Sequence, residues 1–297
     1  MRRQRPIMPL WAIAALHLVF LFNAAFAAST KPPVPVGTDP GGVKIAIIGD
    51  GVDYTQPGIA ARLARDGEGE IIGWDFIDDD RRPFARTPTD TARILLSEGQ
   101  SASLVIIRAN FAGPVAIAKA LRYAAQGPAR IIAVQAPWTD VELAGVLPEA
   151  ASHYPDRLFL AVAGDDNHDL DAADRTSAPT PPHAEIPPNV IIATAAGANG
   201  EIAKGSNWGA HTIDLAIGTT SHLLEMGSGN GAGGGSPSQV ALARLAALAA
   251  RLVAVAPDLD GAALKRRICS LARPVSGAKP STKAGVIVDP WKAYWLE

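Results

Sequence analysis

Two side chains in this sequence are considered as participants in acyl transfer, the hydroxyl of Ser236 and the carboxylate of Asp50. Ser236 precedes Pro237 at the start of a long apolar run, and Asp50 follows the first β-branched run. A serine becomes a nucleophile when a base lies within hydrogen-bond reach, an acid orients that base, and donors face the developing oxyanion. The chemistry to test is therefore serine-type hydrolysis, and it depends on a base.

None of the histidines stands at a place in the sequence where it would be expected to act as that base. After the first 27 residues they are His153, His168, His183, His211 and His222. His153 ends the helix predicted at 140–153, and the other four fall in predicted loops or at predicted strand edges, where a solvated polar side chain is the commoner role. Without a base, Ser236 is expected to be a helix-capping serine.

An acidic segment offers a different chemistry. Asp165, Asn167, Asp169 and Asp171 place oxygen atoms at alternate positions, as calcium-binding loops do. However, Leu170 stands where an EF-hand loop has its turn glycine, and no bidentate glutamate follows at the usual spacing. A solvated acidic loop is the favoured interpretation, and a calcium-stabilised structural module is kept as an alternative.

The elements that must position these residues alternate along the chain. Short β-branched runs predict buried strands at 43–48, 103–108, 130–134, 158–162, 189–194, 212–217 and 284–288. Apolar residues spaced three and four apart predict helices at 114–126, 140–153, 238–255 and 259–271. This alternation indicates an α/β fold with a parallel sheet and helices on both faces.

Length and charge limit the class of protein. The chain has 297 residues, 27 Lys plus Arg and 29 Asp plus Glu, a near balance that argues against a nucleic-acid partner. Its one cysteine, Cys269, excludes a disulfide framework and is expected to be a small buried apolar residue of a helix.

The N-terminus has the pattern of a secretory signal. Arg2, Arg3 and Arg5 precede an apolar run, and Ala25-Phe26-Ala27 fits the small-x-small cleavage rule, so residues 1–27 are predicted to be a signal peptide. An uncleaved membrane anchor is the alternative. Residues 28–42, rich in Pro and Gly, predict a linker, and 43–297 one domain exported to the periplasm or the medium.

Several motifs in order resemble the subtilisin-like serine peptidases, the subtilases. Residues 43–53 (VKIAIIGDGVD) are similar to that family's first catalytic strand, and 158–165 (LFLAVAGD) to its V-x-A-A-G-N. Residues 188–196 (PNVIIATAA), 199–200 (NG), 205–209 (GSNWG) and 213–216 (IDLA) resemble its P-N-V-I-x-V-A-A, N-G, F-S-N-Y-G and V-D-L-A. The resemblance implies a three-layer α/β/α sandwich with a mainly parallel central sheet.

The resemblance also allows each catalytic position to be checked. The family's aspartate falls at Gly49, its histidine nearest Thr87, and its serine at Gly231 or Gly233, depending on the anchor chosen. Asp165 stands where the family has its oxyanion-hole asparagine, and a carboxylate would repel a developing oxyanion. Asp50 is one residue late, which turns its side chain to the other strand face unless the strand bulges.

We therefore interpret the sequence as an exported subtilase-fold pseudoprotease without the Asp/His/Ser triad or a cofactor. Its scaffold is predicted to bind a peptide or protein. The alternative enzyme is a divergent serine endopeptidase that uses the substitutes Asp50 and Ser236. Proline at position 137, where subtilases pair with substrate, lacks the backbone N–H for that pairing and disfavours peptide binding in the family's manner.

Overall fold

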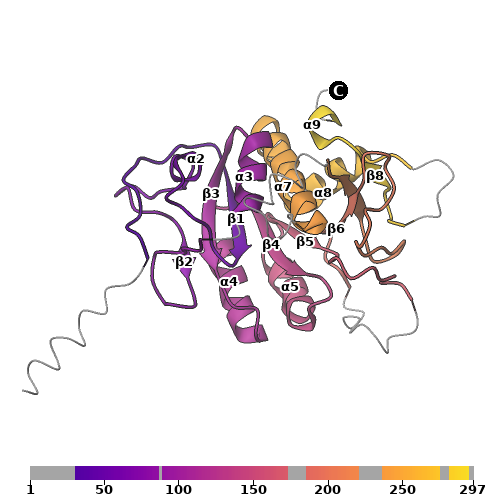
Figure 1. Cartoon of the computed structure of the whole chain (residues 1–297), viewed down its shortest axis with the longest axis horizontal. Coiled ribbons are helices and arrows are strands. Elements are labelled where there is room, and N and C mark those ends of the chain that lie inside the picture. Colours follow the sequence, from indigo (N-terminus) through magenta and orange to yellow (C-terminus); the bar gives the residue numbers. More distant parts are fainter. Residues whose placement is uncertain (1–30, 87–88, 173–184, 221–235, 275–280, 294–297) are drawn as a thin grey trace, which may run out of the picture. The chain divides into compact units, whose positions relative to one another are not determined.

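The computed structural model describes residues 31–86, 89–172, 185–220, 236–274 and 281–293 (Figure 1). The chain divides into two compact units, residues 1–33 and 34–297, and the helices and strands described here belong to the second. The predicted signal peptide therefore lies outside the described residues. Residues 34–42 of the predicted linker belong to the second unit, in which Asp39 accepts hydrogen bonds from the backbone N–H of Arg65 (2.9 Å) and from Lys44 Nζ (3.0 Å).

In the described part of the chain, eight strands form one sheet in which every neighbouring pair is parallel. The spatial order is β2-β3-β1-β4-β5-β6-β7-β8. The strands are β1 Val43–Gly49, β2 Trp74–Asp75, β3 Ala102–Arg108, β4 Ile131–Pro137, β5 Leu158–Val162, β6 Val190–Ala196, β7 Leu215–Gly218 and β8 Val286–Ile287. The carboxyl ends of these strands therefore lie along one edge of the sheet.

Helices cover both faces of this sheet (Figure 1). They are α2 Pro57–Ala60, α3 Asp90–Glu98, α4 Pro114–Gln126, α5 Val141–His153, α7 Pro237–Val255, α8 Gly261–Ser270 and α9 Pro290–Ala293. Alternate residues of β1 separate the two cores: Ile45 and Ile47 pack with α3, α7 and α8, whereas Ala46 and Ile48 pack with α4 and α5. The predicted α/β fold with a parallel sheet between two helical layers is confirmed.

Helix α7 is the core helix of the layer that contains α3 and α8. It is long and apolar enough to cross a membrane by composition, but 83% of its most apolar window is buried inside the protein. Of the described helices it alone meets that length and composition test. Its burial against the sheet explains why apolar residues occupy most of its circumference.

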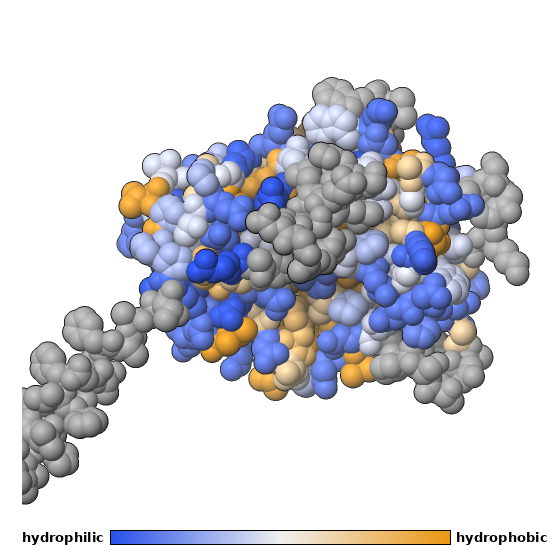
Figure 2. All heavy atoms as spheres, in the orientation of Figure 1, coloured by the Kyte–Doolittle hydropathy of each residue, from blue (hydrophilic) through white to orange (hydrophobic). Residues whose placement is uncertain are grey.

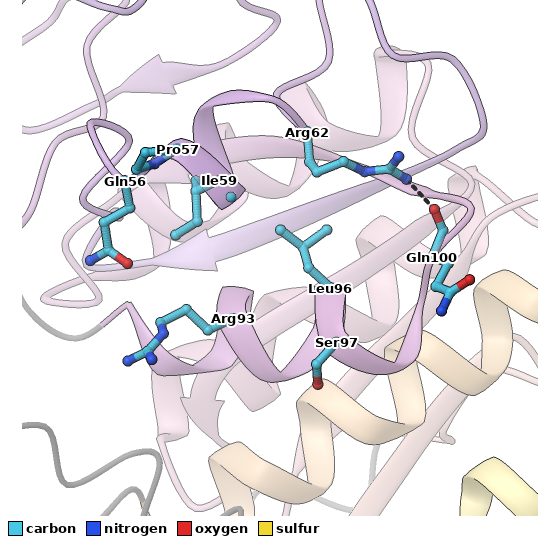
Figure 3. A pocket seen from close by; sticks show the side chains of 9 residues that line it. Gln56, Pro57, Ile59, Arg62, Arg93, Leu96, Ser97 and Gln100 are labelled. Atoms are coloured by element: carbon cyan, nitrogen blue, oxygen red, sulfur yellow. Dashed lines mark hydrogen bonds between the residues drawn. The ribbon is translucent and has the colours of Figure 1, made fainter.

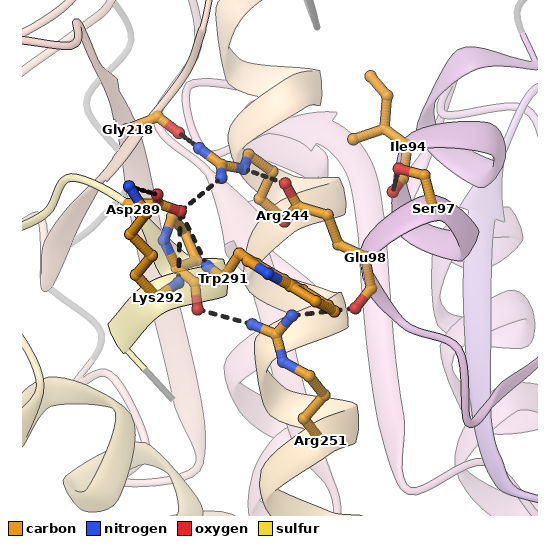
Figure 4. A network of polar contacts seen from close by, with 10 residues as sticks. Ile94, Ser97, Glu98, Gly218, Arg244, Arg251, Asp289, Trp291 and Lys292 are labelled. Carbon is orange, nitrogen blue, oxygen red and sulfur yellow. Dashed lines mark hydrogen bonds and ion pairs between the residues drawn. The ribbon is translucent and has the colours of Figure 1, made fainter. Parts of the chain in front are cut away.

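Two arginines of α7 are buried in this core and hold other elements to it (Figure 4). Arg244, 3% exposed, donates to Glu98 Oε1 (2.8 Å), Asp289 Oδ1 (3.2 Å) and the carbonyl of Gly218. These bonds connect α7 with the end of α3, with β7 and with the segment before α9. Burial raises the pKa of Glu98, and Arg244 only partly offsets this effect.

Arg251 lies about two helical turns further along α7. Its guanidinium donates to the carbonyls of Glu98 (2.9 Å) and Pro290 (2.6 Å) and lies 4.8 Å from the ring centroid of Trp291. Helices α3 and α9 are therefore attached to α7 by the same two side chains.

Most predicted elements are present with shifted ends. Helix α8 begins at Gly261 because the side chain of Asp260 accepts from the backbone N–H of Ala263 and caps it (2.6 Å). The strand predicted at 212–217 begins only at Leu215. Strand β2 and helix α3 were not predicted as elements.

Candidate functional site

Asp165 and Ser236 lie together beside the carboxyl end of β5 and the first turn of α7. Ser236 is the N-cap residue of α7, and its Oγ donates a hydrogen bond to Asp165 Oδ2. Asp165 Oδ1 accepts from Ser206 Oγ (2.8 Å) and Ser238 Oγ (2.9 Å), and Oδ2 also accepts from the backbone N–H of Ser238 (3.3 Å). Three serine hydroxyls and one helix N–H thus surround one carboxylate.

The helix explains why a carboxylate is stable at this place. The first N–H groups of a helix lack intrahelical partners, and the helix dipole favours negative charge there. The side chain of Ser236 makes no capping bond, so the expectation of a helix-capping serine is wrong in detail. Asp165 supplies the cap from another part of the chain, and Ser236 is one of its donors.

A second polar cluster fills the space beside Gly49. Gln135 Nε2 donates to Thr91 Oγ1 (2.9 Å), Gln239 Nε2 donates to the carbonyl of Gln135 (2.7 Å), and Thr91 Oγ1 contacts Gln239 Oε1 at 3.4 Å. A Cβ built on Gly49 would lie 1.7 Å from Oε1 of Gln135. This amide cluster (Gln135, Thr91, Gln239) joins β4, α3 and α7 at the carboxyl end of β1.

The contact between Gly49 and the amide cluster predicts that a larger residue at position 49 lowers stability. We expect Gly49→Ala to lower the free energy of unfolding by about 1–3 kcal/mol, because the new methyl displaces Gln135 from Thr91. In a Gln135→Ala background the same change should cost much less. Urea unfolding of the four proteins of this double-mutant cycle measures the coupling.

Gly145→Ala is the control, since a Cβ at that α5 position meets nothing within 4 Å. Equal costs of Gly49→Ala in both backgrounds would show that Gln135 does not fill the space beside Gly49.

Asp50 is not brought into contact with Ser236. The parallel pairing of β1 with β3 keeps one register from Val43 to Gly49, without a bulge, and Asp50 is exposed just beyond it. Its carbonyl accepts from Arg108 Nε (3.1 Å). Among the described residues no hydrogen bond links the side chain of Asp50 to Ser236. The bulge that Asp50 would need to reach the aspartate position is therefore absent from this pairing.

None of the described histidines forms a hydrogen bond with Ser236. His153 is in the last turn of α5, where its Nδ1 is 2.8 Å from the carbonyl oxygen of Glu149. His168 and His211 use their backbone N–H groups to contact Asn207 Oδ1 (2.8 Å) and Asp171 Oδ2 (2.7 Å). Thr87, Gly231, Gly233, His183 and His222 lie outside the described residues.

The cysteine is an unsuitable nucleophile. Cys269 is half-buried in α8, and burial raises the pKa of its thiol to about 11. The thiol is therefore protonated at neutral pH, and only the thiolate is strongly nucleophilic.

The acidic loop is organised by backbone N–H groups. Asp171 accepts from the N–H groups of His211 (2.7 Å) and Thr212 (2.9 Å), and Asp169 accepts from the N–H of Asp171 (3.0 Å). Asn167 adopts φ 58°, in the left-handed region. Within the described ranges there is no group of three or more His, Cys, Asp or Glu side chains placed to hold a metal ion.

Several residues that build these clusters could not be identified from sequence pattern alone. Thr91, Gln135, Gln239, Ser206 and Ser238 are individually ordinary polar residues, and their role depends on elements up to 148 residues apart. The pairing of Ser236 with Asp165 spans 71 residues and was also not predicted.

Comparison with known proteins identifies the fold. No family model and no curated protein matches the sequence. Solved structures do match: a lanthipeptide protease (16% identity, TM-score 0.65, 88% of this chain and 90% of that one), the A-subunit of the AB5 toxin from E. coli (18%, 0.63, 87% and 94%), and a cold-adapted subtilisin-like serine proteinase (15%, 0.56, 87% and 96%).

Each of these structures is matched over at least 87% of this chain. At such low identity the likeness concerns the arrangement of the chain and not its chemistry. The motifs in the sequence and the structure agree, and the chain has the subtilisin-like, or subtilase, fold.

Proposed function

We propose that this chain is an exported subtilase-fold protein that does not hydrolyse peptides through a Ser/His/Asp triad and that binds a peptide or protein. The observation that carries the proposal is the hydrogen bond from Ser236 to the carboxylate of Asp165. Ser236, the serine that the sequence offers as a nucleophile, thus donates to a carboxylate, and among the described residues no hydrogen bond links it to a histidine.

The electrostatics of this arrangement oppose acyl transfer. An oxyanion formed at Ser236 would lie close to the carboxylate of Asp165, whereas catalysis needs donors aimed at the oxyanion. Loss of a single oxyanion donor costs about 10²–10³ in rate, and loss of the nucleophile or base costs far more. The oxygens of Asp165 also accept hydrogen bonds from Ser206, Ser238 and a helix N–H, so the proton of Ser236 would have to compete with these donors.

The amide cluster supports the same proposal. In the alignment with subtilases, Gly49 takes the place of the catalytic aspartate, and Gln135 fills the space that its side chain would need. Gln135, Thr91 and Gln239 have no ionisable group, so they cannot transfer a proton at neutral pH. They connect three elements, which is a structural role.

A second candidate function follows from the contact between Ser236 and Asp165. A divergent serine endopeptidase could use Asp165 as the base that deprotonates Ser236, in place of the exposed Asp50. The geometry supplies that pair, but it places a carboxylate where the family has its oxyanion-hole amide, so this enzyme is the weaker candidate.

Export is part of the proposal because of residues 1–27, with their arginines, apolar run and Ala25-Phe26-Ala27. If this segment is cleaved, the purified exported protein will begin near Ala28, and N-terminal sequencing measures this directly.

Casein hydrolysis tests the main proposal. We expect the exported protein to release no more fluorescence from labelled casein than its Ser236→Ala variant does. Turnover that disappears in Ser236→Ala but persists in the matched variant Ser270→Ala, an exposed serine at the end of α8, would establish the endopeptidase instead.

Thermal unfolding with added calcium and with EDTA tests the calcium-stabilised module separately. That module requires a higher melting temperature in calcium.

A further inference from the structure

A groove lies between α2 and α3, and none of its lining residues belongs to the Ser236–Asp165 contact or to the amide cluster. Its volume is about 630 Å³, in the range of ligand-binding clefts. Ile59 of α2 and Leu96 of α3 point toward each other across it (Figure 3). On the visible face of the 34–297 unit, by contrast, apolar residues lie mostly between hydrophilic ones (Figure 2).

The two ends of the groove carry positive charge. Arg93 lies at one end and Arg62 at the other, with the apolar side chains of Ile59 and Leu96 between them (Figure 3). None of the residues that line the groove is Asp or Glu. The lining therefore favours a ligand that is acidic at both ends and apolar in the middle.

The partners of these arginines leave room for such a ligand. Arg62, which is half-buried, uses Nη2 to donate to the carbonyls of Gln100 (2.6 Å) and Ala102, and within the described residues it forms no ion pair with a carboxylate. Arg93 has a loose ion pair with Asp90 (3.6 Å) and is 43% exposed. A guanidinium has five N–H donors, so both side chains retain donors for a carboxylate.

Amide side chains accompany the arginines. Gln56 lies near Arg93, and Gln100 lies near Arg62 (Figure 3). Side-chain amides both donate and accept, as the backbone of an extended peptide does. In an extended peptide, alternate side chains share one face and are about 7 Å apart, so positions i, i+2 and i+4 can meet one end, the middle and the other end.

We propose that this groove binds an extended peptide segment of the pattern acidic-x-apolar-x-acidic. The apolar side chain packs against the partly exposed Leu96, over the buried Ile59, and the two carboxylates bind Arg62 and Arg93. This inference rests on the proposed function, of which it names the partner class, and it places the binding away from Ser236 and Asp165. An anionic lipid is the other class that apolar and cationic groups attract, but amides at both ends favour a peptide.

Isothermal titration of the purified protein with acetyl-Gly-Glu-Ala-Leu-Ala-Glu-Gly-amide tests the proposal. We expect saturable binding, about three- to tenfold weaker for Arg93→Gln, and unchanged for Arg122→Gln, an exposed arginine on α4 at the other face of the sheet. Replacing both Glu of the peptide by Lys, or its Leu by Ser, should abolish binding. Leu96→Asp, which puts a like charge in the groove, should do the same.

Three results would overturn the proposal: no saturable binding, equal affinity for the Lys peptide, or equal weakening by Arg122→Gln. Decanoate that binds more tightly than the peptide and displaces it would assign the groove to a lipid-like anion. Casein hydrolysis does not involve the groove, so an inert protein that fails to bind the peptide would overturn this inference and leave the absence of triad catalysis standing.

Discussion

Replacing Arg244 by alanine is expected to lower the free energy of unfolding by about 3–5 kcal/mol. The change removes the guanidinium that pairs with Glu98 (2.8 Å) and Asp289 (3.2 Å) and leaves the carboxylate of Glu98, 12% exposed, without its ion-pair partner. Glu98 Oε2 is already buried with no hydrogen-bond partner among the described residues. Loss of a partner from a buried pair costs more than the pair contributes, because a charge remains in a poorly solvated place.

The pH dependence gives a second readout of the same variant. Burial raises the pKa of Glu98, so the folded protein favours the neutral form of this side chain. The contribution of Glu98 to stability is therefore greatest at low pH and is lost as pH rises through the folded pKa. In Arg244→Ala the pKa should rise further. The deficit relative to wild type should therefore shrink as pH falls through that pKa, because Glu98 then takes a proton.

Urea unfolding of Arg244→Ala, Glu98→Ala and the double variant measures the coupling, and Arg266→Ala, an exposed arginine of α8, is the matched control. We expect the double variant to recover part of the loss. A cost below about 1 kcal/mol for Arg244→Ala, in the range of exposed ion pairs, would show that the pair with Glu98 is solvated.

The second large effect is expected at Asp165. Asp165→Ala should lower the free energy of unfolding by about 2 kcal/mol, because hydrogen bonds to charged groups contribute more than neutral ones. The change removes the acceptor of Ser206, Ser236 and Ser238 and the cap of α7. The loss stays moderate because the freed hydroxyls can turn to water.

Asp166→Ala is the control for that measurement, since this neighbouring carboxylate is exposed. Asp165→Asn should retain part of the stability, as the amide oxygen still accepts while the charge is gone. If Asp165→Ala and Asp166→Ala cost the same, the carboxylate of Asp165 does not hold the start of α7.

The fold was largely predictable from local sequence. The apolar runs that became β1, β3, β4, β5 and β6 are β-branched and bounded by turn residues, so their type and burial follow from short-range pattern. Strand β2 has only Trp74–Asp75 and pairs with the end of β3, too short for any period to be visible. Its existence depends on its neighbour.

The candidate site was predictable only in part. Asp165 and Ser236 were identified as single residues, and their contact appears only when the end of β5 meets the start of α7. The role of Gln135 could not be predicted, because it depends on contacts with Gly49 and Thr91 that only the fold brings together. The charge pattern of the groove likewise needed α2 and α3 to be side by side.

The central claim is that Ser236 is bound to a carboxylate and is not an activated nucleophile. Intact mass spectrometry after incubation with a fluorophosphonate probe tests it most directly, because the probe adds one phosphonyl group to a catalytic serine. We expect an unmodified mass under conditions that fully label an active serine peptidase. A stoichiometric adduct on the native protein, absent from Ser236→Ala, would contradict it.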